Sequence, residues 1–82
     1  MERKILAEEI VSFCIEYKIK GFPKEKSIAQ SRVEEYLQYD WFIENLIQTL
    51  LLKTKYIKNI DNKKLEALLA ELEKVRLDLE YN

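Results

Sequence analysis

Residues 62–81, NKKLEALLAELEKVRLDLEY, form the stretch that decides the fold of this chain. Its apolar residues recur at alternating steps of three and four, and they are Leu65, Leu68, Leu72, Val75 and Leu79. This spacing places them along one side of an α-helix, in a coiled-coil-like seam that packs against other helices. Asp61 can cap the first turn, with Ile60 and Leu65 packed across the cap. The stretch therefore predicts a helix in an all-α bundle.

The composition favours long helices and few turns. The chain has 82 residues, of which 48% are hydrophobic and 35% are charged, with a single Gly and a single Pro. Glu, Lys, Leu and Ile are abundant, and all but Ile rank among the strong helix formers. A chain of this length makes one domain, so we expect one helical bundle over residues 1–82.

A first helix is predicted over residues 2–20, with two apolar faces that require two neighbours. Gly21 suits the left-handed residue just past a helix end, where Phe22 can fold back onto Tyr17, and Pro23 then prevents the helix from continuing. The next helix begins with a capping box at Ser27 or at Ser31, and the pattern leaves both starts open.

The middle of the chain, up to residue 58, contains neither Gly nor Pro after this turn. Its apolar stripe stays in phase on both sides of Asp40, which favours one continuous helix. The sequence therefore predicts an antiparallel three-helix bundle with a long central helix. The alternative is a break near Asp40, where the aspartate caps a third helix and the chain forms a four-helix bundle.

A long central helix would leave both of its ends thinly covered, and this predicts an interaction surface. Apolar side chains on its outer side are Leu37, Trp41, Leu52 and Tyr56. Pairing two copies covers such a surface, with Trp41 as the central anchor. We therefore predict a homodimeric interaction or regulatory module, of the antitoxin, immunity or inhibitor-like kind, which binds a further protein through its helix faces.

The lysines cluster around the two expected connections between helices, and this indicates a second class of function. The candidate phosphate contacts are Lys24, Lys26, Lys58 and Lys63. A nucleic-acid-binding regulator would need both lysine groups on one surface. The three-helix arrangement places them at opposite ends, whereas a four-helix arrangement gathers them at one end. The net charge of −1 supplies no overall attraction to nucleic acid.

Residues that carry catalysis are scarce, so we predict no enzyme, no cofactor and no metal. The chain lacks histidine, and nothing beside Cys14 would activate its thiol, so a small buried residue is expected there. The acidic pairs Glu8–Glu9 and Glu34–Glu35 are expected in solvent. A lone cysteine favours a reducing, cytoplasmic setting. The longest apolar run has four residues, far below the ~20 of a transmembrane helix.

Overall fold

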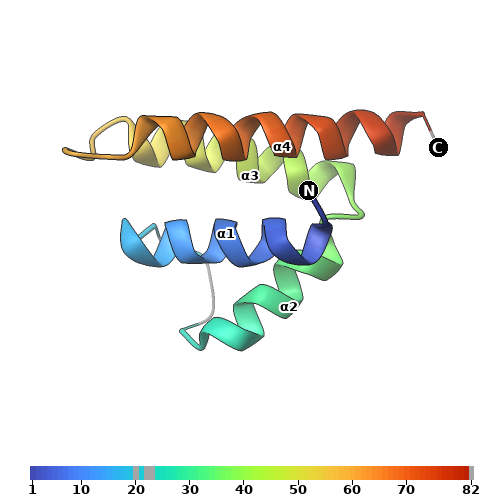
Figure 1. Ribbon diagram of the computed structural model, residues 1–82, viewed down its shortest axis with the longest axis horizontal. Coiled ribbons are helices and arrows are strands. Elements are labelled where there is room, and N and C mark those ends of the chain that lie inside the picture. Colours follow the sequence, from blue (N-terminus) through green and yellow to red (C-terminus); the bar gives the residue numbers. More distant parts are fainter. Residues whose placement is uncertain (20, 22–23, 82) are drawn as a thin grey trace.

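Four α-helices make up the computed structural model, which describes residues 1–19, 21 and 24–81. The helices are α1 (Arg3–Glu16), α2 (Lys26–Tyr36), α3 (Asp40–Thr54) and α4 (Asn62–Glu80). They form two helical hairpins, α1 with α2 and α3 with α4, and α1 also packs against α4 (Figure 1). Thus α1 has the two neighbours that its two apolar faces predicted. The described residues include no β-strand.

The break between α2 and α3 corrects the predicted continuous central helix, and the four-helix alternative is the right one. The Tyr39 N–H donates to the Tyr36 carbonyl at 2.9 Å, which tightens the last turn of α2. Tyr39 then takes an extended backbone conformation and precedes α3, so Asp40 is the first residue of α3 rather than its cap. The apolar stripe stays in phase because Leu37, in the turn, and Ile43, after it, both enter the same core.

The end of α1 also differs from the prediction. The helix ends at Glu16, and the left-handed residue that follows is Lys18, with φ 55°, rather than Gly21. The Ile19 N–H donates to the Cys14 carbonyl at 2.8 Å and the Lys18 N–H to the Ile15 carbonyl at 3.2 Å. These two bonds make a Schellman motif. The predicted end at Lys20, the Phe22 contact and Pro23 lie outside the described residues.

The start of α2 shows neither predicted capping box. The helix begins at Lys26, one residue before Ser27, and the Ser27 hydroxyl donates to the Glu25 carboxylate at 3.3 Å. The predicted start of α4 is confirmed. The Asp61 carboxylate accepts a hydrogen bond from the Lys64 N–H at 3.1 Å, so it caps the helix.

A single hydrophobic core lies between the two hairpins. Four residues of the α4 seam are buried in it, and these are Leu65, Leu68, Leu72 and Val75. Leu37 is fully buried there as well, so its predicted place on an outer surface is wrong. The physical reason is the break, because the turn after α2 points this side chain inward. None of the helices in the described part of the chain has the length and hydropathy needed to cross a bilayer.

Candidate functional site

The outer face of α3 carries large apolar side chains in solvent. The inner face is buried through Ile43, Leu46 and Leu50. On the opposite side Trp41 is 58% exposed and Leu52 is 61% exposed, eleven residues or about three helical turns apart. We call this surface the α3 outer face, made of Trp41, Asn45, Gln48, Leu52 and Lys55. It is available to a partner, because all five residues are exposed.

Trp41 is exposed but held in place by other rings at the corner between α2 and α3. It stacks on Tyr39 with ring centroids 5.9 Å apart and planes tilted by only 19°. Phe42 meets it edge-on at 6.0 Å, and Phe42 itself packs against the core. The ring centroid of Tyr36 lies 5.4 Å from that of Phe42 and 6.2 Å from that of Trp41. A ring fixed in this way loses little conformational entropy when a partner covers it.

The charges on α3 are separated along its length. Asp40 and Glu44 lie in the first half, Lys53 lies in the last turn, and Lys55 is the C-cap residue that follows the helix. Within the described residues, the ion pairs all involve α4, where Glu71 pairs with Lys74 and with the Met1 amino group and Glu73 pairs with Arg76. The charged side chains of α3 are therefore available to an outside partner.

Of the four residues predicted for an interaction surface, the structure brings two together. Trp41 and Leu52 share the α3 outer face, whereas Leu37 is in the core. Tyr56 is 87% exposed but lies beyond the last residue of α3, in the connection to α4. Glu44 and Lys55 were not among the predicted residues, although the sequence shows an acidic residue near the start and a lysine just past the end of this amphipathic helix.

The two connections α1–α2 and α3–α4 lie at the same end of the molecule (Figure 1). This is the arrangement that the four-helix alternative implied. At this end Lys18 and Lys53 line a hollow of about 270 Å³ with Tyr17, Ile19 and Ile57. The Asp61 N–H donates to the Tyr17 hydroxyl at 2.9 Å, which ties the end of α1 to the start of α4.

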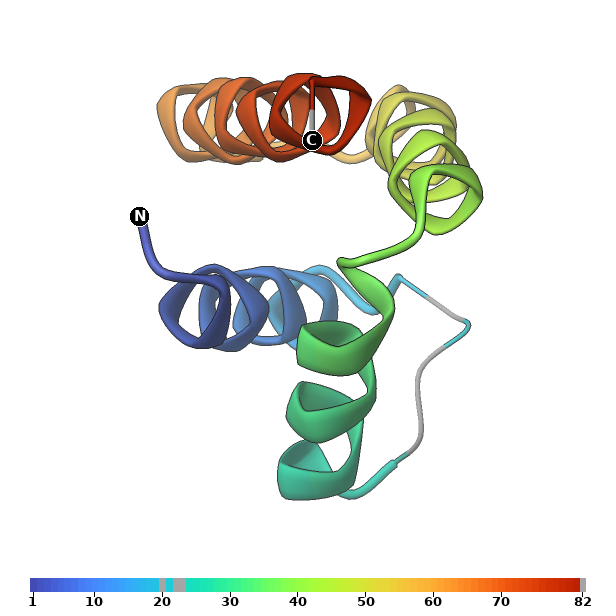
Figure 2. The same ribbon diagram turned by 90° about the vertical axis from the view of Figure 1, so that its right-hand side faces the viewer.

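The four lysines predicted as phosphate contacts do not converge on this hollow. Lys58 and Lys63 belong to the α3–α4 connection and the first turn of α4. Lys24 and Lys26 lie at the start of α2, which slants away from α4 (Figure 2). Lys18 and Lys53 were missed, because only the four-helix topology brings the ends of α1 and α3 together.

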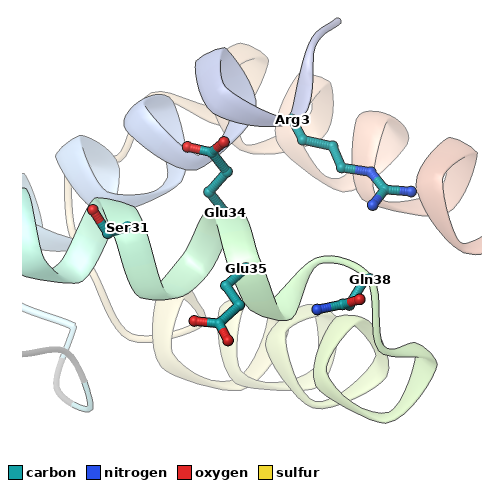
Figure 3. Close-up of a pocket in the computed structure, with 5 residues that line it drawn as sticks. All are labelled: Arg3, Ser31, Glu34, Glu35 and Gln38. Carbon is teal, nitrogen blue, oxygen red and sulfur yellow. The ribbon is translucent and has the colours of Figure 1, made fainter.

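A larger hollow, of about 440 Å³, lies between the first turn of α1 and one side of α2. Its lining is polar, and consists of Arg3, Ser31, Glu34, Glu35 and Gln38. All five are exposed, so the hollow is open to water. In Figure 3 the Glu34 carboxylate points toward α1, the Glu35 carboxylate points away from it, and the Arg3 guanidinium extends away from both. Nothing in this arrangement desolvates a carboxylate or pairs one for proton transfer.

Cys14 is buried, as the sequence analysis predicted. Burial raises the pKa of its thiol to about 12, so the group is protonated and unreactive at neutral pH. Among the residues that the structure describes, no three Cys, Asp or Glu side chains gather closely enough to hold a metal ion.

No protein family, curated protein or solved structure matches the chain.

Proposed function

We propose that this chain is a small, non-enzymatic regulatory module that pairs with a second copy of itself through the α3 outer face. The observation that carries the proposal is the exposed Trp41, which other rings hold in place on the side of α3 opposite the core. A large apolar side chain left in water forgoes roughly 1.5–3 kcal/mol of burial. Tryptophan is also enriched among the residues that dominate protein interfaces.

Charge favours an antiparallel arrangement of the two copies. Parallel pairing would place the acidic halves of the two α3 helices together, and like charges across an interface repel. Antiparallel pairing places the acidic half of one α3 against the basic half of the other. With the two-fold axis beside Gln48, Trp41 of one copy lies within one helical turn of Leu52 of the second copy, and Glu44 lies within one turn of Lys55. Such a two-fold contact is self-complementary and closes.

The size of the contact predicts a weak dimer. A 15-residue helix is about 22 Å long and about 10 Å wide. Its footprint is well below the ~800 Å² per partner of a standard interface. We therefore expect a dissociation constant in the micromolar range, which suits a module that exchanges partners under regulation.

Sedimentation equilibrium over a concentration series tests the proposal. Trp41→Ala should weaken association about tenfold or more, because it removes the central anchor. Tyr81→Ala is the matched control, since Tyr81 is 85% exposed and follows α4 rather than belonging to the α3 outer face. A chain that stays monomeric at several hundred micromolar would contradict the proposal.

A charge exchange tests the antiparallel orientation separately. Glu44→Lys and Lys55→Glu should each weaken the dimer roughly fivefold, because each breaks two symmetry-related pairs. The double variant restores opposite charges across the axis and should recover most of the affinity. If the double variant is weaker than both single variants, the copies do not pair in this orientation.

A further inference from the structure

The end of the molecule that holds the α1–α2 and α3–α4 connections is strongly basic, and we call it the basic end. Its described residues are 16–19, 21, 24–26 and 53–64, in which eight lysines face three acidic residues, a net charge of +5. Because the whole chain carries −1, the remaining residues carry −6. The near-zero total therefore conceals two regions of opposite charge, and a polyanion approaching the basic end meets a strong local attraction.

Three residues with donor groups line the hollow in the basic end. Lys18 and Lys53 line it, and they come from the ends of two different helices. Tyr17 is the third, because its hydroxyl oxygen already accepts the Asp61 N–H at 2.9 Å. A phenol that accepts one hydrogen bond still has its own O–H to donate. Two ammonium groups and one O–H donor suit the oxygens of a phosphate.

Several lysines occupy positions that a stability argument alone disfavours. Lys18 is in the left-handed conformation with φ 55°, where glycine is the usual residue at a helix end. Lys63 and Lys64 lie in the first turn of α4, at the positive end of the helix dipole, where a cation is unfavourable. Strained or unfavourable placement of this kind is typical of residues kept for binding.

We propose that the basic end binds the phosphate backbone of single-stranded nucleic acid without reading its sequence. The hollow between Lys18 and Lys53 takes one phosphate, and Lys58 extends the positive surface along the strand. Tyr56, 87% exposed among these lysines, offers a ring on which a base can stack. This inference is independent of the proposed pairing through the α3 outer face.

Two features favour a single strand over a duplex. The basic end presents the ends of helices rather than the side of one, so no helix is positioned to enter a major groove (Figure 1). The exposed Tyr56 needs an unpaired base to stack against. The basic end also contains lysine without arginine, which suits backbone contact rather than bidentate reading of base edges.

Fluorescence anisotropy with a labelled oligothymidine of about 20 nucleotides tests the inference. We expect micromolar affinity at about 50 mM salt. With three phosphates contacted, affinity should fall roughly 15- to 20-fold between about 50 and about 200 mM salt. The double variant Lys18→Ala/Lys53→Ala should bind at least about tenfold more weakly. Its control, Lys4→Ala/Lys74→Ala, removes the same charge outside the basic end and should bind within about twofold of the wild type.

Two further variants separate binding from folding. Lys18→Gly should raise the melting temperature, because glycine adopts the left-handed conformation without strain, and it should still weaken binding. Tyr56→Ala should weaken binding roughly fivefold or more through lost stacking. Trp41→Ala should leave the binding of an oligonucleotide too short to span two copies intact even if it abolishes pairing, so the two proposals fail separately.

Four outcomes would overturn the inference. These are no binding at low salt, equal losses in the two double-lysine variants, duplex DNA bound as tightly as the single strand, or binding to phosphatidylserine vesicles without binding to the oligonucleotide.

Discussion

Replacing Leu37 with alanine is the sharpest test of the break between α2 and α3. Leu37 is 0% exposed at the end of α2, whereas a continuous central helix would place it in solvent. Truncating a fully buried leucine costs about 3–5 kcal/mol, because the lost transfer energy adds to the cost of a cavity. The whole chain should be stable by only ~4–12 kcal/mol, at roughly 0.05–0.15 kcal/mol per residue. Leu37→Ala therefore removes a large share of the free energy of unfolding.

Urea denaturation followed by far-ultraviolet circular dichroism measures the effect of Leu37→Ala. For a small domain with a slope near 1 kcal/mol per molar, a loss of about 3–5 kcal/mol should lower the urea midpoint by about 3–5 M. Leu52→Ala makes the same chemical change at a side chain that is 61% exposed, and should alter stability by less than about 0.5 kcal/mol at low protein concentration. If the two variants lose similar small amounts, Leu37 is not in the core and the reasoning fails.

Two further predictions follow from single side chains. Asp61→Ala removes the cap on the Lys64 N–H and should cost about 1 kcal/mol, whereas Asp78→Ala near the end of α4 should be neutral or slightly stabilising; thermal melts compare them. Burial raises the pKa of Cys14 from 9.0 to about 12, so at high pH the folded chain keeps a proton that the unfolded chain releases. Stability should therefore fall as the pH rises above about 9, by up to ~1.4 kcal/mol per unit. Urea titrations should show this loss in the wild type and not in Cys14→Ala.

Periodicity and capping chemistry predicted the class of the fold and the last helix well. The seam of α4 and its Asp61 cap follow from local rules that the tertiary structure does not override. The break between α2 and α3, by contrast, was not predicted, because no breaker residue marks it. The turn at residues 37–39 contains neither Gly nor Pro, and hydrogen bonds to the carbonyls of Tyr36 and Glu35 hold it together. An apolar stripe that stays in phase does not exclude such a turn, because the apolar residues of α2 and of α3 are buried in one common core.

The candidate sites divide in the same way. Trp41 and Leu52 were predictable, because both lie on one helix and helical spacing alone places them on its outer face. The hollow between Lys18 and Lys53 was not, because it joins the ends of two helices far apart in the sequence. The geometry of this hollow depends on where the chain reverses direction. A three-helix arrangement would place the two lysine-rich connections at opposite ends of the molecule, whereas the four-helix arrangement places them at the same end. The prediction of a nucleic-acid-binding surface therefore depended on the number of helices.

The turn at residues 37–39 links the core to both proposed surfaces. It buries Leu37, and it places Tyr36, Tyr39 and Trp41 together at one corner. It also reverses the chain, so that the α1–α2 and α3–α4 connections lie at the same end while the turn between α2 and α3 lies at the other end (Figure 1). An antiparallel pair through α3 would then have a basic end at each of its extremities, beside the aromatic corner of the other copy. Two separated phosphate-binding ends on one dimer would act on a single strand with an effective concentration set by their spacing. Weak pairing and weak backbone contact would then reinforce one another, and an oligonucleotide long enough to span both ends should promote the dimer.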